Sequence, residues 1–301
     1  MKTIEQHLDN LTNPDYLSLS RILTFVENEL PGSAEILSAI RINQSIPVVG
    51  ITGPPGAGKS SLVNAMIKKM TQEGKKIAVL AVDPTSPFNL GSLLGDRIRM
   101  SNHFNNPDVF IRSIAARGSV GGLSTKIIEM VDILKSSFFD YIFVETVGVG
   151  QSEIEIAGLA DITLIVLVPE AGDDIQHIKS GLMEIGNAFI VNKADRPGAD
   201  MFANQLNMIL HKRSDRVPVF KTIADQNAGT DELVLWLLSQ GHADNKRKLY
   251  LYTEKAYRLI QNQRMQDVSK TELQQHIFSA YQRVDFNIYR FIRTYLKPTS
   301  T

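Results

Sequence analysis

Short apolar, β-branched runs alternate with segments of helical periodicity from Ile46 onward. A continuous apolar run such as Ile162–Pro169 is typical of a strand covered on both faces, as in a parallel sheet. The pattern therefore predicts an α/β fold with a mainly parallel sheet wound by helices. The strands are expected at Val48–Thr52, Ile77–Asp83, Val109–Ile114, Tyr141–Val147, Ile162–Pro169, Ala188–Asn192 and Val217–Thr222.

The two ends of the chain lack this alternation and are predicted to be helical. We expect an N-terminal helical segment at 1–45, a central domain at 46–238 and a C-terminal helical arm at 239–301. In the first segment, apolar residues at helical spacing predict packing onto the central domain: Leu17, Leu19, Ile22, Leu23 and Val26.

In the arm, apolar residues recur at steps of four or three: Leu273, Ile277, Ala280, Val284, Ile288, Phe291 and Tyr295. Ser269 and Glu272 form a candidate capping box at the start of this seam. The seam could pack on the chain's own domain or on a second copy. Its regularity resembles a coiled-coil edge and favours a homodimer.

Composition narrows the class of protein. The 301 residues include 32 basic and 32 acidic side chains, so no global field favours nucleic acid or an anionic membrane as partner. No cysteine is present, which excludes disulfides and thiolate metal sites. The start of the sequence resembles neither a signal peptide nor a transit peptide, and no apolar run has the length of a membrane span. We therefore expect a cytoplasmic protein.

The strongest local motif is Gly-Pro-Pro-Gly-Ala-Gly-Lys-Ser at 53–60, which follows a predicted strand and precedes a predicted helix. This order is typical of a P-loop: glycines turn backbone N–H groups toward phosphates, Lys59 reaches the β and γ oxygens, and Ser60 contacts Mg²⁺. The positive end of the following helix adds to the attraction. The candidate phosphate-binding residues are Gly53, Pro54, Pro55, Gly56, Ala57, Gly58, Lys59, Ser60 and Ser61.

A second motif, Asn192-Lys193-Ala194-Asp195, follows an apolar run and indicates guanine. A carboxylate at Asp195 can accept from both the ring N–H and the exocyclic amine of guanine, whereas adenine presents an acceptor in place of that ring donor. Sites built on such hydrogen bonds reject the wrong analogue by about 10⁴-fold or more. We therefore expect GTP and GDP as ligands.

Magnesium requires hard oxygen ligands near the γ-phosphate. The candidates are Ser60, Asp83, Asp96 and Glu145. Asp83 and Glu145 close predicted strands, where open α/β sheets bind their ligands. Lys59, Ser60, Asp96 and Glu145 are the candidate catalytic residues.

Five segments together resemble the MeaB (ArgK-type) GTPases, the G-protein chaperones of adenosylcobalamin-dependent methylmalonyl-CoA mutase. They are Gly50–Ser60, Ala81–Phe88, Gly95–Met100, Glu145–Glu153 and Gly172–Gly181. The resemblance implies a homodimeric GTPase that binds the acyl-CoA mutase, gates loading of its cofactor and protects or reactivates it.

Residue by residue, the resemblance places the phosphates at Gly53–Ser61 and the base at Asn192, Lys193 and Asp195. It places magnesium and the first switch at Asp83, Asp96 and Glu145, and an additional switch at Gly172–Lys179. The chain departs from the family at Thr222-Ile223-Ala224-Asp225, where a Ser-Ala-type guanine loop is expected. Backbone contacts from Ile223 and Ala224 remain the expectation there.

Val149 stands after Gly148, where many small GTPases carry a glutamine that orients water. A missing water-orienting residue or arginine finger changes rates by about 10³ to 10⁵. We therefore expect slow intrinsic hydrolysis that a partner stimulates. The local groups that could assist are Arg97, Arg99, Gln151 and Lys179.

Three alternative functions stay open. A nickel-delivery GTPase would need soft or borderline metal ligands, but cysteine is absent and the six histidines are scattered. A small-molecule kinase or transport ATPase would use adenine, against the motif at Asn192–Asp195. The third is a scaffold that has kept the fold but lost turnover.

Overall fold

The computed structural model describes residues 7–8, 11–83, 100, 103, 105–115, 126–146, 148, 152–169, 180–213, 216–240, 245–282 and 286–295. The chain forms two compact units, Met1–Leu249 and Tyr250–Thr301. Each unit is described separately below.

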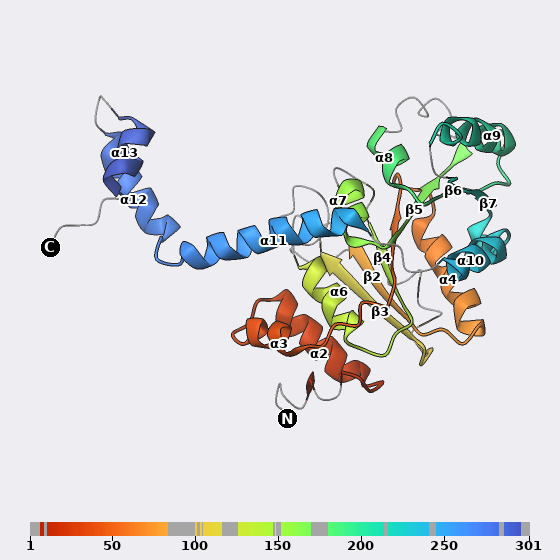
Figure 1. The fold of residues 1–301 in the computed structure, drawn as a ribbon, viewed down its shortest axis with the longest axis horizontal. Helices are drawn as coiled ribbons and strands as arrows, with labels where there is room; N and C mark the ends of the chain where they lie inside the picture. Colours follow the sequence, from red (N-terminus) through yellow and green to blue (C-terminus); the bar gives the residue numbers. More distant parts are fainter. Residues whose placement is uncertain are drawn as a thin grey trace. The chain divides into compact units, whose positions relative to one another are not determined.

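The first unit is built on a sheet of seven strands that all pair in parallel, in the order β3-β2-β4-β1-β5-β6-β7 (Figure 1). This confirms the predicted α/β fold. The strands are β1 (Val48–Thr52), β2 (Ile77–Asp83), β3 (Val109–Ala115), β4 (Tyr141–Glu145), β5 (Ile162–Leu167), β6 (Ala188–Asn192) and β7 (Val219–Thr222).

Three predicted strand ends were wrong by two residues. β4 ends at Glu145, because Gly148 turns the chain with a φ of 83°. β5 ends at Leu167, just before Pro169, and β7 begins after Pro218. Proline has no N–H to donate to a sheet, which explains the limits of β5 and β7.

Helices cover both faces of the sheet, so that four of its strands are wholly buried. One apolar cluster joins the sheet to α4 and α10, and another joins it to α7, α8 and α9. The helices are α2 (Tyr16–Glu27), α3 (Ser33–Ala39), α4 (Lys59–Gln72), α6 (Ile127–Lys135), α7 (Ser152–Leu159), α8 (Ser180–Ile185), α9 (Ala199–Leu210) and α10 (Thr230–Ser239). The short 3₁₀ helix η3 (Ala224–Gln226) follows β7.

The N-terminal helix α2 packs beside the edge strand β3 and the helix α6. The ring of Tyr16 stacks on Phe110 at 5.8 Å between centroids. Arg112 donates to the carbonyl oxygen of Ser20 at 3.1 Å and pairs with Glu27. Of the apolar residues predicted to face inward, Leu19, Ile22, Leu23 and Val26 are buried, whereas Leu17 is exposed. Helix α2 thus covers an otherwise open sheet edge.

The second unit contains most of α11 (Lys246–Arg264), with α12 (Lys270–Tyr281) and α13 (Ile288–Tyr295). Ser269 caps α12 as predicted, since its side chain accepts from the N–H of Glu272 at 3.3 Å. The predicted seam, however, does not follow one helix, because residues 286 and 287 are not helical. His276 on α12 and Tyr295 on α13 meet edge to face at 5.8 Å. The seam residues are therefore divided between two short helices.

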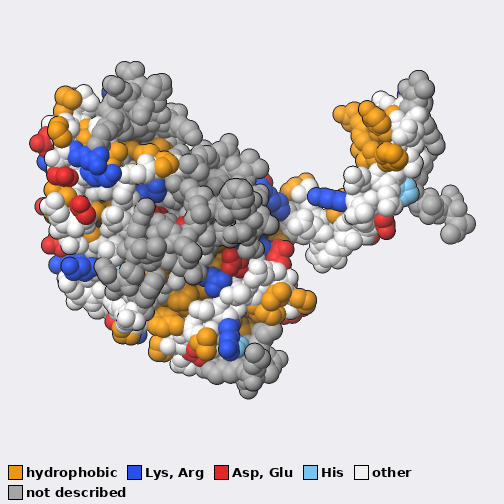
Figure 2. Space-filling view, turned by 180° about the vertical axis from the view of Figure 1, so that it is seen from behind, with side chains coloured by type: hydrophobic (Ala, Val, Ile, Leu, Met, Phe, Trp, Pro, Cys, Tyr) orange, Lys and Arg blue, Asp and Glu red, His pale blue; other side chains and the backbone are white. Residues whose placement is uncertain are grey.

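Other apolar side chains of the second unit face solvent, and hydrophobic groups gather on its surface in Figure 2. On α12 and α13, the exposed large apolar side chains are Phe278, Tyr281, Ile288, Tyr289 and Ile292. Among the described residues, none of the helices is long and apolar enough to cross a membrane.

Candidate nucleotide-binding site

The P-loop at 53–60 leaves the central strand β1 and enters α4 directly. Gly53, Gly56 and Gly58 have φ values of 143°, 77° and 85°, a region that side chains disfavour. A Cβ at Gly53 would lie 2.0 Å from the carbonyl oxygen of Val166, so glycine is required for the close approach of β5. The sequence therefore forms the turned backbone that a phosphate cradle needs.

Lys59 is buried at the first position of α4 and points back across the loop. Its Nζ donates to the carbonyl oxygens of Gly53 at 3.0 Å and Pro54 at 3.1 Å. The loop thus holds a cation at its centre, in front of the N-terminal end of a 14-residue helix. Both features favour a bound anion.

Ser60 and Glu145 converge beside this lysine. The Oγ of Ser60 donates to Oε1 of Glu145 at 2.7 Å, which joins the first turn of α4 to the end of β4. Asp83 is buried at the end of the neighbouring strand β2, two residues beyond Ala81, which pairs with Glu145. Because β2 and β4 are parallel, their last residues bring these carboxylate oxygens to the same end of the sheet.

This oxygen set fits Mg²⁺, a hard cation that prefers carboxylate and hydroxyl ligands and retains several waters. Within the described parts of the chain, no three acidic or histidine side chains cluster closely enough to hold a metal alone. A magnesium site here would therefore use Ser60, Glu145 and Asp83 together with phosphate and water. The fourth predicted ligand, Asp96, lies outside the described residues.

Gly148 lies directly against the loop. A Cβ on it would be 2.0 Å from the carbonyl oxygen of Gly53 and 2.8 Å from Nζ of Lys59. Just before it, the buried hydroxyl of Thr146 donates to Oγ1 of Thr52 at 2.8 Å, and its N–H donates to Ile51. Thr146, which follows β4, is therefore hydrogen-bonded to the end of β1, where the P-loop begins.

Asn192 joins three segments of the site. Its Nδ2 donates to the carbonyl oxygen of Ala57 in the P-loop at 2.9 Å. Its Oδ1 accepts from Oγ1 of Thr222 at 3.0 Å and from the N–H of Ala224 at 3.1 Å. A Cβ at Gly58 would lie 2.3 Å from Nδ2 of Asn192, so this link also needs the glycine. Asn192 therefore positions the loop after β7 relative to the phosphate loop.

Lys193 strengthens the same junction, since its Nζ donates to the carbonyl oxygen of Gly56 at 2.8 Å. It has a φ of 57°, which turns the chain at the end of β6. Asp195 follows in an exposed turn, where its carboxylate is accessible to a ligand. Ile223 and Ala224 lie on the adjacent loop, which the bond from Ile223 N–H to the Ala228 carbonyl closes at 3.0 Å.

The structure thus brings together the predicted phosphate loop, Glu145 and the Asn192 motif at the carboxyl ends of the central strands. The sequence did not predict the roles of the hydroxyls of Thr52, Thr146 and Thr222, which join these segments by hydrogen bonds. Each threonine stands at a strand end beside a recognised motif, which is the only signal that the sequence offered. Several predicted residues lie outside the described part: Asp96, Arg97, Arg99, Val149, Gln151 and 172–179.

The comparisons with known proteins agree with this geometry. Residues 19–282 match the family model described as "Methylmalonyl Co-A mutase-associated GTPase MeaB". A protein of Pyrococcus abyssi, provisionally named as a GTPase, is 46% identical over 238 residues, which cover 76% of this chain and 74% of that protein. The fused isobutyryl-CoA mutase of Geobacillus kaustophilus is 33% identical over 255 residues, or 78% of this chain and 23% of that longer protein.

Among solved structures, a LAO/AO transport system kinase has a TM-score of 0.66, with 97% of this chain and 96% of that chain covered. Its sequence identity is 23%, so this likeness shows a shared fold alone.

Proposed function

The chain belongs to the MeaB family of methylmalonyl-CoA mutase-associated GTPases, and on that premise we propose that it binds and hydrolyses GTP as a chaperone of an adenosylcobalamin-dependent acyl-CoA mutase. Methylmalonyl-CoA mutase is the first candidate partner. In this role the nucleotide state gates loading of the cofactor and supports protection or reactivation of the mutase.

The observation that supports this proposal most strongly is the similarity of this chain to part of the fused isobutyryl-CoA mutase. A stretch similar to most of this chain is there part of the same polypeptide as a mutase. Two activities joined in one chain have a high effective concentration, which favours a functional contact between them. We therefore assign this chain, as a separate protein, the same kind of partner.

In the proposed complex with nucleotide, the turned backbone of 53–58 and the amine of Lys59 bind the phosphates. Ser60, Asp83 and Glu145 hold Mg²⁺, with Asp96 as a further candidate. When bound, the cation neutralises charge on the phosphates. Asp195 reads the guanine, the loop of Ile223 and Ala224 lies against the base, and Asn192 with Lys193 keeps these loops in register. Gly148, which lies against the loop, is the proposed sensor of the γ-phosphate.

Hydrolysis by the isolated protein is proposed to be slow and to rise on mutase binding. Val149 follows Gly148 in the sequence, at the position where many small GTPases carry a glutamine that orients the attacking water. The exposed apolar side chains of α12 and α13 support a homodimer, because a surface of this kind is stabilised when another chain covers it.

A binding experiment with purified methylmalonyl-CoA mutase tests the chaperone assignment. The protein is titrated into the mutase by isothermal calorimetry with GDP and then with a non-hydrolysable GTP analogue, at saturating nucleotide. We expect binding whose affinity differs between the two nucleotides. Lys59→Ala should abolish the difference, while Lys212→Met, an exposed substitution on the same domain, should preserve it.

Absence of binding in both nucleotide states, with isobutyryl-CoA mutase tested in parallel, would reject the chaperone role. GTP binding by the protein alone would then still stand.

A further inference from the structure

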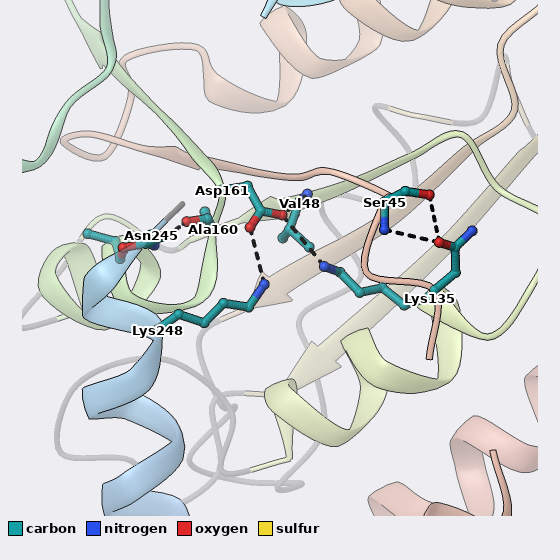
Figure 3. Close-up of polar contacts among 9 residues, drawn as sticks. Ser45, Val48, Lys135, Ala160, Asp161, Asn245 and Lys248 are labelled. Carbon is teal, nitrogen blue, oxygen red and sulfur yellow. Dashed lines mark hydrogen bonds and ion pairs between the residues drawn. The ribbon is translucent and has the colours of Figure 1, made fainter. Parts of the chain in front are cut away.

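The start of α11 is fastened to the end of α7. Residues 245–248, called the arm root below, belong to the first compact unit. The Nδ2 of Asn245 donates to the carbonyl oxygens of Ala157 at 2.8 Å and Ala160 at 2.6 Å (Figure 3). The last carbonyls of a helix have no partner within it, so this amide caps α7 from a distant part of the chain.

The arm root also holds the end of α8. A guanidinium nitrogen of Arg247 donates to the carbonyl oxygen of Glu184 at 3.0 Å. Arg213, after α9, donates to the carbonyls of Met183 at 2.7 Å and Gly186 at 3.0 Å. Helix α8 therefore ends between two arginines, one from the α9 side and one from the arm root.

A buried carboxylate completes the attachment. Asp161, which directly precedes β5, accepts from the N–H of Val48 at 2.8 Å. The Nζ of Lys248 donates to the other carboxylate oxygen, Oδ1 of Asp161, at 3.1 Å (Figure 3). The Nζ of Lys135 on α6 lies 3.6 Å from Oδ2 of Asp161. The arm root thus contacts the sheet at the beginnings of β1 and β5, at the opposite end of β1 from the P-loop.

The same helix α7 packs closely on the strand that leads into the P-loop. A Cβ on Gly50 would lie 2.5 Å from Ile156 and 2.9 Å from Ala160, so α7 rests on the backbone of β1 three residues before Gly53. Helix α7 also begins at Ser152, four residues after Gly148, which lies against the P-loop. Helix α7 therefore lies between the strand that enters the P-loop and the side chain of Asn245.

We propose that the arm root is a coupling element through which the nucleotide state of the P-loop, acting on α7 and α8, changes the stability of the first turns of α11. This inference rests on the proposed function, because it requires a bound nucleotide. Packed helices with two discrete arrangements carry such coupling between sites. Because α11 continues into the second unit, its first turns join that unit covalently to the first.

Hydrogen exchange of the full-length protein, read by mass spectrometry over residues 246–252, tests the coupling. Exchange reports the local opening of backbone amides. With GDP and with a non-hydrolysable GTP analogue, both saturating, the wild-type protein should show rates that differ at least threefold. In Asn245→Ala the first turns lose their anchor, so exchange should be fast with both nucleotides.

Two further variants provide a control and a second readout. Asn262→Ala, an exposed change on the same helix, should retain the wild-type difference. Arg247→Met removes only the bond to Glu184 and should reduce the difference, which provides a readout even if Asn245→Ala fails to fold. Nucleotide affinity of each variant is measured with a fluorescent GDP derivative and should stay within about twofold of wild type.

Equal exchange in the two nucleotide states, with both nucleotides bound, would overturn the coupling and leave the proposed GTPase function intact. A wild-type difference that persists in Asn245→Ala would equally overturn it, because the signal would then bypass the arm root. Failure of the wild-type protein to bind either nucleotide would reject the proposed function and the coupling together.

Discussion

The hydroxyl of Ser60 donates a 2.7 Å hydrogen bond to Oε1 of Glu145, although 85 positions separate the two residues. The bond joins the first turn of α4 to the end of β4, at the point where the sheet order places β4 beside β1. A hydroxyl and a carboxylate so close together form the oxygen pair that a magnesium ion would use.

Ser60→Ala should therefore weaken nucleotide binding mainly in the presence of magnesium. One hydrogen bond to a charged group contributes about 1.5 to 3 kcal/mol, so we expect a loss of about tenfold or more in Mg²⁺-dependent GDP affinity. Titration of a fluorescent GDP derivative with and without EDTA measures the change. Ser38→Ala, exposed on α3, is the control. Equal losses with and without magnesium would argue against a cation role for Ser60.

Asn192→Ala should destabilise the protein and lower its affinity for nucleotide. The variant leaves the carbonyl of Ala57, the hydroxyl of Thr222 and the N–H of Ala224 without their partner. Loss of such a buried network costs about 2 to 4 kcal/mol in unfolding free energy. Urea unfolding measures the loss, and Asn204→Ala, exposed on α9, should change it by less than about 0.5 kcal/mol. An unchanged midpoint for Asn192→Ala would contradict the positioning role.

The sequence predicted what local patterns encode. Apolar runs identified all seven strands, and the glycine spacing identified the loop at 53–60. The partners of Asn192 and Thr146 could not be predicted, because they depend on which strands become neighbours. The seam of the arm was ambiguous for a related reason: its spacing suits one long helix as well as the two short helices that place His276 near Tyr295.

The burial of Lys135 could not be predicted either, because a lysine at the end of an amphipathic helix normally faces solvent. Here its side chain is only 1% exposed. Burial, together with the nearby Lys248, lowers the pKa of Lys135 to about 8 against the opposing attraction of Asp161. The structure thus places two lysines around one buried carboxylate.

This lowered pKa makes stability depend on pH. Between pH 8 and 10.5 the unfolded chain holds more protons at this lysine than the folded protein does, so its contribution to the unfolding free energy rises with pH. Below pH 8 the cost of burying the charged amine is fully present. Over this window the wild-type protein should gain roughly 1 to 3 kcal/mol relative to Lys135→Met.

Urea titrations at pH 7.5 and pH 10 measure the difference. The exposed change Lys212→Met should follow the wild-type curve. Parallel pH dependence of Lys135→Met and wild type would show that the buried amine does not titrate in this window.

The C-terminal unit should mediate self-association. Phe278 and Tyr289 are 69% and 78% exposed, and burial of such aromatic side chains in a second copy would stabilise a dimer. Sedimentation equilibrium should give the mass of a dimer for wild type and for the control Met201→Gln on α9. The double change Phe278→Asp and Tyr289→Asp should give a monomer that still binds GDP. A dimer that survives both charges would place the interface elsewhere.

Base discrimination by Asp195 tests the central claim, that this chain is built to read GTP, most directly. Competition against a fluorescent GDP derivative should show that wild type prefers GTP to ATP by about 10⁴-fold. Asp195→Asn should lose at least about a hundredfold in GTP affinity and gain affinity for XTP, because an amide can donate to the C2 carbonyl of xanthine. Equal affinity of the wild-type protein for ATP and GTP, or a preference that Asp195→Asn leaves unchanged, would contradict the account.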